Sequence, residues 1–307
     1  MKIYKLKIKV KSSNITPWQS DTIFGSLCWA LSQKEGEESL NNFLAEYEKG
    51  QYSFVVSDGF PGDYLPKPMA GNLFPIEEIN KDKAIENAKK AKRAKKTNFV
   101  TIEEFNKIIN NGLTEIQSKE KQSVEVGVMH NQISRLTDTT EEGGLYELQE
   151  VFWQNHLSIF FTVDEVLKGK IIDLFEILAI KGFGKRAAVG KGSFTIDKLE
   201  EFTGFNIPPN ANSFVTLSNY VPKANDPVLG QYKTFVKYGK LGQDYAYRGN
   251  PFKKPLLMIL PGAVFWTKQP QLAYGRLVKK ISPQFTNVIQ SGCTLAIPSF
   301  IDKPEVG

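Results

Sequence analysis

The segment Gly182–Gly192, GFGKRAAVGKG, decides how the fold of this chain is interpreted. Its four glycines form two G-x-G groups separated by five residues, with Lys185, Arg186 and Lys191 among them. Glycine costs backbone entropy, so such a cluster needs a reason, for example close approach of the backbone to a partner. Backbone N–H groups beside Lys and Arg suit phosphate. We predict a phosphate-contacting loop, and the alternative is a tight loop that only turns the chain.

The spacing of the glycines excludes two nucleotide-binding loops. A P-loop requires G-x-x-x-x-G-K-[ST], but five residues separate Gly184 from Gly190 here. Residues 182–187 formally satisfy the Rossmann pattern G-x-G-x-x-A, but a Rossmann turn follows a strand and opens a helix. A predicted helix precedes this loop, and its later glycines disfavour a helix after it. The loop is therefore not predicted to bind a nucleotide.

The elements around the loop follow the order of a split β-α-β fold. Alternating apolar residues predict strands, and apolar residues at helical spacing predict helices. The predicted elements, in chain order, are a strand at 4–11, a helix capped by Ser20 or Asp21, a short helix at 37–47, strands at 52–57 and 151–163, a helix at 164–180 and a strand at 193–197. This order predicts a ferredoxin-like (RRM-like) domain.

A long insertion, 58–150, interrupts this order. Its lysine-rich run at 84–96 is interpreted as a solvated helix face, and Thr101 with Glu104 forms a capping box for a short helix. Residues 123–148 predict a projecting hairpin that turns at 141–144. The strand at 4–11 also carries a row of outward lysines, which could follow a phosphate backbone or simply be solvated.

The second half of the chain is predicted to be β-rich. The segment Ile207-Pro208-Pro209-Asn210 marks a boundary, and strand patterns without a long helix follow it. We therefore expect an α+β protein with two ferredoxin-like domains, the second of them degenerate. The first would span 1–206, including the insertion, and the second 207–307.

Composition limits the protein class and its location. The chain has 307 residues, is 41% hydrophobic and carries a net charge of +6, which permits a polyanionic partner without requiring one. Cys28 and Cys293 lie in apolar surroundings and are expected to be free buried thiols, as in a reducing cytosol. The start resembles no signal peptide, and the longest apolar run, 256–266, is too short to cross a bilayer. We expect a cytoplasmic protein without membrane contact.

Several motifs together resemble a known family. A G-x-G-x5-G-x-G loop after the last helix of a ferredoxin-like domain is similar to the signature of CRISPR-associated RAMP proteins. The motifs at Ser20–Leu31 (SDTIFGSLCWAL), Leu65–Pro68 (LPKP) and His130–Thr137 (HNQISRLT), with the C-terminal half, narrow the match. They resemble the subunit family of type III-A (Csm) effector complexes that caps the 5′ end of the guide RNA. The resemblance covers nearly the whole chain and is weakest at 81–121.

The resemblance implies a non-catalytic RNA-binding subunit without a cofactor. The family's glycine loop holds the 5′ handle of the guide RNA, and its thumb hairpin, here 123–148, lies near the junction of handle and guide. The implied partners are the guide RNA, the large subunit with the cyclase-type palm and a backbone RAMP subunit, with target RNA contacted indirectly. The expected RNA-binding residues are Gly182, Phe183, Gly184, Lys185, Arg186, Gly190, Lys191, Trp18, Ser20, His130, Asn131, Arg135, Arg248 and Lys254.

Some of these expectations have explicit alternatives. Trp18, Phe183 and Tyr247 could stack on bases, but packing is the favoured interpretation for each of them. Arg248 and Lys254 are expected as secondary handle contacts, the alternative being a solvated loop. A metal-independent endoribonuclease is the alternative function, since relatives of this fold process guide RNA, and His130 with Arg135 would then be its base and cation. Two distant cysteines and two isolated histidines predict no metal site.

Overall fold

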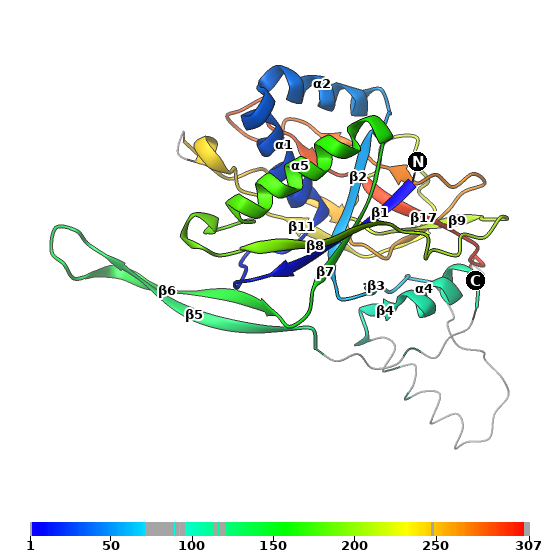
Figure 1. The fold of residues 1–307 in the computed structure, drawn as a ribbon, viewed down its shortest axis with the longest axis horizontal. Coiled ribbons are helices and arrows are strands. Elements are labelled where there is room, and N and C mark those ends of the chain that lie inside the picture. The colour runs from blue at the N-terminus through cyan, green and yellow to red at the C-terminus, as the bar shows by residue number, and fades with distance from the viewer. Residues whose placement is uncertain are drawn as a thin grey trace.

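The computed structural model describes residues 2–70, 89, 92, 96–112, 116, 121–246 and 249–303. Most of the lysine-rich run at 84–96 therefore lies outside the described residues, and so do Tyr247 and Arg248. Within the described residues the chain is a mixed α/β protein with several antiparallel sheets, as Figure 1 shows.

A four-stranded antiparallel sheet organises the first half of the chain. Its strand order is β2-β7-β1-β8, and the chain visits it in the order β1-α1-β2-β7-α5-β8, which is the split β-α-β order. Its elements are β1 (Lys2–Val10), α1 (Ser20–Glu35), β2 (Phe54–Pro61), β7 (Leu157–Val163), α5 (Glu165–Lys181) and β8 (Phe194–Glu201). The β-α-β expectation for this half is confirmed.

The two long helices pack on one face of this sheet. From β1, Tyr4, Leu6 and Ile8 are buried in the main hydrophobic core, together with the predicted apolar face of α1. Burying one face of the sheet against an apolar helical stripe is what stabilises such a layer. A further helix, α2 (Glu37–Glu48), follows α1 directly and packs beside it.

The lysine row of β1 is only partly solvated, which corrects the sequence interpretation. Lys5 is 3% exposed, ion-paired to Asp63 at 2.5 Å and close to the rings of Phe160 and Phe202. Segments distant in sequence cover this end of the row, so a charge that alternation placed outside is buried. Lys9, at the other end of the strand, is exposed.

The insertion contributes a small sheet and a helix beside the body. The capping box is confirmed, since Thr101 and Glu104 bond reciprocally at the start of the helix. The elements are β3 (Tyr64–Pro66), β4 (Phe99–Thr101) and α4 (Ile102–Ile109).

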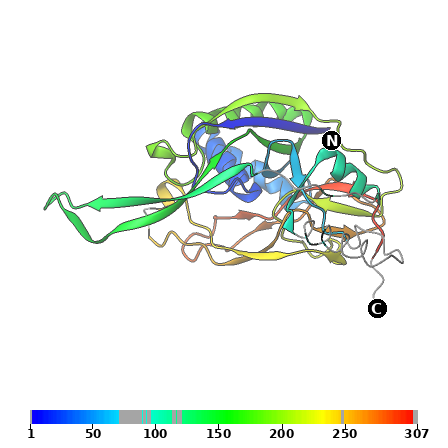
Figure 2. The ribbon, with the colours of Figure 1, turned by 90° about the horizontal axis from the view of Figure 1, so that it is seen from below.

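The predicted hairpin is present and projects far from the body in both views (Figures 1 and 2). It consists of β5 (Ser123–Ile133) and β6 (Thr140–Trp153). Their antiparallel pairing begins with Ser123 opposite Trp153 and ends with Ile133 opposite Thr140. Its turn lies at 134–139 and not at 141–144, because the latter residues belong to β6, at the register shift of its pairing with β5. The strand predicted at 151–163 is two strands, since β6 ends at Trp153 and β7 begins at Leu157.

The second half is β-rich, as predicted. Among its described residues it has no α-helix, so the β-α-β order of the first half is not repeated there. Its strands form a five-stranded sheet and two smaller pairs. They are β9 (Ser213–Thr216), β10 (Gly230–Gln231), β11 (Thr234–Lys237), β12 (Leu256–Ile259), β13 (Val264–Trp266), β14 (Ala273–Tyr274), β15 (Leu277–Val278), β16 (Gln290–Ser291) and β17 (Thr294–Ser299).

One hydrophobic core continues across the predicted boundary near residue 207. Leu217, Leu295 and Ile297 belong to the same cluster of buried side chains as Leu6 and Phe161. The division into 1–206 and 207–307 therefore remains a prediction. Both cysteines are free, with Cys293 buried and Cys28 partly buried. In the part of the chain described, none of the helices is both long and apolar enough to cross a membrane.

Candidate functional site

The loop Gly182–Gly192 begins where α5 ends. All four of its glycines have positive φ, between 65° and 86°, and so does Arg186 at 62°. A short 3₁₀ turn, η1 (Ala187–Val189), lies between them. Left-handed backbone is unfavourable for residues with a Cβ. The glycine spacing is therefore explained first by backbone conformation.

Two of the glycines are also required by close packing. A Cβ on Gly184 would collide with the side chain of Thr16, and a Cβ on Gly192 would collide with the carbonyl of Phe183. At Gly190, by contrast, a Cβ would point into open space. Gly184 thus lets the loop lie against the segment that follows β1, and Gly192 lets the two ends of the loop lie against each other.

That segment holds the loop through backbone and side-chain bonds. The amide of Lys185 donates to Thr16 Oγ1 at 2.8 Å, and the amide of Gly192 donates to the Ser13 carbonyl at 2.8 Å. These bonds orient the loop before any ligand is bound.

The rings of Trp18 and Phe183 fasten the same segment to the loop from inside. They stack with centroids 4.0 Å apart and planes at 15°, and both side chains are buried. Neither ring offers a free face to a base, so the packing alternative holds and the stacking role is corrected.

Two of the three loop cations are engaged by the hairpin. Arg186 donates to His130 Nδ1 at 3.1 Å and to the hydroxyl of Tyr146. Lys191 Nζ lies 2.6 Å from Glu150 Oε2. His130, Tyr146 and Glu150 lie on one face of the hairpin. His130 is the cross-strand partner of Tyr146, and Glu150 is four residues from Tyr146 in β6, which brings it to the same face. We call Arg186, Lys191 and these three residues the loop–hairpin joint.

Glu150 is the buried centre of this joint. Its side chain is fully buried, accepts from Ser13 Oγ at 2.5 Å, and faces His130 Nε2 at 3.4 Å. Burial would favour the neutral carboxyl, but the hydrogen bonds from Lys191 and Ser13 and the charge of Lys191 together lower the pKa of Glu150. Sequence reasoning missed Glu150, since a glutamate in a strand carries no motif.

The third loop cation, Lys185, has an exposed side chain. It forms no ion pair with any residue that the structure describes. Lys9 and Lys11 are exposed nearby, since the amide of Lys11 donates to the Ser193 carbonyl, next to the end of the loop. Lys9 and Lys11, at the end of β1, and Lys185, in the loop, are the exposed lysines that we call the exposed cation group. Lys9 and Lys11 were visible in sequence only as part of the alternating row.

Ser20 is a buried structural residue, which corrects its assignment as an RNA contact. Its amide donates to Asp58 Oδ1 at 2.8 Å, and its hydroxyl accepts from the Asn219 amide at 3.1 Å. It does not cap α1 either, because the N-cap is Gln19, without a side-chain cap bond.

The remaining predicted residues lie apart from the loop–hairpin joint. Asn131 is exposed on the hairpin and bonds Thr140 across the strands at 2.8 Å. Arg135 lies in the hairpin turn, so the cation beside His130 is Arg186 and not Arg135. Lys254 is exposed in the second half, where only its backbone bond to Ile281 is observed.

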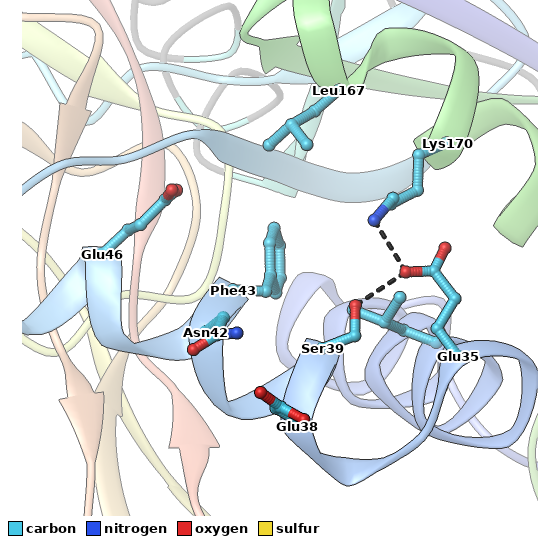
Figure 3. Close-up of a pocket in the computed structure, with 9 residues that line it drawn as sticks. Glu35, Glu38, Ser39, Asn42, Phe43, Glu46, Leu167 and Lys170 are labelled. Carbon is cyan, nitrogen blue, oxygen red and sulfur yellow. Dashed lines mark hydrogen bonds and ion pairs between the residues drawn. The ribbon is translucent and has the colours of Figure 1, made fainter.

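Two other kinds of site find little support. Within the described ranges, no group of three or more His, Cys, Asp or Glu side chains could hold a metal ion. A depression of about 400 Å³ between α1, α2 and α5 has an acidic rim over an apolar floor, which disfavours a polyanion (Figure 3). Its lining includes Glu35, Glu38, Glu46, Lys170, Phe43 and Leu167.

Comparison with known proteins places this fold. No protein-family model and no curated protein sequence matches the chain. Among solved structures, a chain of the Csm1–Csm4 cassette in complex with cA4 matches with a TM-score of 0.66 and 18% identity, covering 99% of this chain and 100% of that one. The cassette with AMPPNP gives 0.65 and 18% over the same shares. A chain of the Csm3–Csm4 subcomplex of the type III-A CRISPR–Cas interference complex gives 0.63 and 14%, covering 97% and 99%.

These matches extend along almost the entire chain. The chain thus has the fold of a subunit found in type III-A CRISPR–Cas assemblies, in agreement with the RAMP resemblance of its motifs. Csm4 is the component that the cassette and the subcomplex have in common, and this chain is Csm4-like in fold.

Proposed function

We propose that this chain is a non-catalytic RNA-binding subunit of a type III-A CRISPR interference complex. It binds the 5′ handle of the guide RNA and joins the large subunit to the RAMP backbone. The observation that carries the proposal is the exposed cation group, Lys9, Lys11 and Lys185, in and near a loop whose backbone is already held in shape. Exposed lysines beside a fixed backbone suit the phosphates of a single strand.

The loop–hairpin joint divides the predicted contacts into two groups. Lys191 and Arg186 are held by the hairpin and so shape the site, whereas Lys185 is available to phosphate. Gly190 has open space beside it, so an RNA backbone can approach the loop there. The remaining predicted contacts, Asn131, Arg135, Arg248 and Lys254, stay part of this proposal as outer contacts.

The finer assignments belong to the same proposal. The division at 206/207 into two ferredoxin-like domains, with a degenerate second domain, stays part of this proposal. The β-α-β order of the first half supports the ferredoxin-like character of the first domain only. The partners are proposed from the complexes in which chains of this fold occur, Csm1–Csm4 and Csm3–Csm4. A cytoplasmic location follows from that role.

The direct test is binding of a labelled RNA that carries the repeat-derived 5′ handle. Lys185→Ala should weaken binding several-fold and reduce the salt dependence of the affinity, because one phosphate contact is lost. Lys2→Ala is the matched control. It removes another exposed lysine, from the same strand as Lys9 and roughly 23 Å away from it at about 3.3 Å per residue. Equal affinity of wild type, Lys185→Ala and a Lys9→Ala/Lys11→Ala variant would contradict the proposal.

The endoribonuclease alternative is favoured by one observation, the contact between His130 and a cation. His130 Nδ1 accepts from Arg186 at 3.1 Å, which joins a potential base to a group that could stabilise a charged transition state. Its ring is mostly covered, however, with the His130 side chain 16% exposed. Site-specific cleavage of repeat RNA in EDTA, lost in His130→Ala, would replace the scaffold proposal with this one.

A further inference from the structure

The two-stranded sheet β11–β12 carries an exposed apolar stripe that neither the core nor the proposed RNA site uses. Val236 and Leu257 are direct cross-strand partners and are 44% and 61% exposed. Tyr238, two residues further along the same face, is 75% exposed. The other face of the sheet is buried, with Met258 in a small hydrophobic cluster. We call Val236, Tyr238, Phe252 and Leu257 the β11–β12 stripe.

Phe252 extends the stripe at one end. It is 53% exposed and forms a bridge with Lys240, whose Nζ lies 4.5 Å from the centre of the ring. Exposed apolar side chains that share one face and are rimmed by polar residues can mark a protein-interaction site.

β11 is also an edge strand. In the part of the chain that the structure describes, it pairs with β12 on one side and with no strand on the other. Figure 2 shows it, in yellow, along the border of the body on the side away from α5 and β8. An open edge beside an apolar stripe can accept an extended segment, with backbone bonds along the edge and side chains on the stripe.

The charges around the stripe define the chemistry of that segment. Lys233 and Lys240 are exposed, and neither of them pairs with a carboxylate among the described residues. These cations favour a partner with acidic residues. A second copy of this chain is disfavoured, because pairing two β11 edges would bring lysines against lysines.

RNA is a weaker fit to the same surface. Binding of single strands relies on free aromatic faces for stacking. One face of Phe252 is occupied by Lys240, which leaves Tyr238 as the exposed ring of the stripe, and the centre of the stripe is the aliphatic pair Val236 and Leu257. An aliphatic centre with an aromatic residue and a polar rim is typical of protein interfaces.

We propose that the β11–β12 stripe docks an extended segment of a partner protein, with apolar residues at alternate positions and acidic residues beside them. This inference rests on the proposed function for its choice of partner, a protein subunit of the same complex. It adds the surface at which that subunit is held.

The test uses the full chain in two separate co-expressions, one with the large subunit and one with the backbone subunit. Both subunits are taken from the same CRISPR locus as this chain. Leu257→Glu should weaken assembly with one of them at least tenfold, and Lys233→Glu/Lys240→Glu should weaken assembly with the same subunit. Val166→Glu is the matched control, because Val166 is 93% exposed on α5, away from β11. In the assembled wild-type complex, the amides of β11 should gain protection from hydrogen exchange.

Each outcome decides the inference. Assembly that is unaffected by both variants, without protection of β11, overturns it and leaves the proposed function standing. A wild type that assembles with neither subunit and does not bind handle RNA overturns both. Protection of β11 by handle RNA alone, or self-association that Leu257→Glu abolishes, would assign the surface to RNA or to a second copy and overturn the protein-docking proposal.

Discussion

The ammonium of Lys191 lies 2.6 Å from the carboxylate of Glu150, whose side chain is fully buried. This pair joins the glycine loop to the projecting hairpin across 41 positions of sequence. Its partners are unequal, since Lys191 keeps 26% of its side chain exposed. Removing Lys191 would leave a buried charge without a partner, whereas removing Glu150 would leave a lysine that solvent still reaches.

Lys191→Met should therefore lower the free energy of unfolding by about 3 kcal/mol, near the lower end of the range for an orphaned buried charge. Lys185→Met, which removes an exposed lysine of the same loop, should change it by less than about 0.5 kcal/mol. Adding Glu150→Gln to Lys191→Met should recover part of the loss. Urea unfolding measures the stability of all three variants. Equal stability of the two single variants would show that the Lys191–Glu150 ion pair does not stabilise the protein.

Substitutions of Gly190 and Gly192 distinguish the steric from the conformational contribution to the free energy of unfolding. Gly190→Ala should cost about 1–2 kcal/mol, because only its left-handed backbone is unfavourable there. Gly192→Ala should cost about 2–5 kcal/mol, because its Cβ would also collide with the Phe183 carbonyl. Thermal unfolding ranks the two variants, and the reverse order would be inconsistent with this loop conformation.

Phe183 is expected to act through packing. Phe183→Ala should lower the free energy of unfolding by about 3–5 kcal/mol, since it removes a fully buried ring stacked on Trp18. The handle-RNA affinity of the variant that remains folded should stay within a few-fold of wild type. If the variant kept its stability and lost RNA affinity, Phe183 would be a base-stacking residue after all.

Asp58 should make stability depend on pH. Burial raises its pKa to about 7, above the ordinary value of 3.8, against the opposing hydrogen bonds from Ser20. Between about pH 4 and pH 7 the folded state binds the extra proton, so its stability falls as the pH rises through this window. The difference corresponds to about 4 kcal/mol at most.

Asp58→Asn keeps an oxygen for the Ser20 amide and cannot ionise. Its free energy of unfolding should match wild type near pH 4 and exceed it by about 2–4 kcal/mol at pH 8. Urea unfolding at several pH values gives both curves. Curves that run parallel from pH 4 to pH 8 would mean that Asp58 is ionised in the folded protein throughout.

Local patterns determined the elements of the first half. Alternation and helical spacing predicted the strand at 4–11, the helix at 164–180 and the hairpin, and the residue types at Thr101 and Glu104 predicted a cap that is present. These features depend on neighbours close in sequence, which is why a single chain suffices to infer them. The motif set likewise led to a resemblance with type III-A CRISPR–Cas subunits, whose fold the structural matches share along almost the whole chain.

Only the tertiary structure decided which of the named side chains are available. Ser20, Trp18 and Phe183 are buried by segments up to about two hundred positions away, and Lys5 is covered in the same manner. Within the loop, the sequence could not distinguish Lys185 from Lys191. Lys185 is exposed, whereas Lys191 is ion-paired with Glu150, which lies in a strand distant in sequence. The glycine pattern determined where the loop lies, whereas the positive φ of its glycines is known from the structure. Long-range packing decided which of its charges face solvent, because burial depends on contacts that local periodicity does not encode.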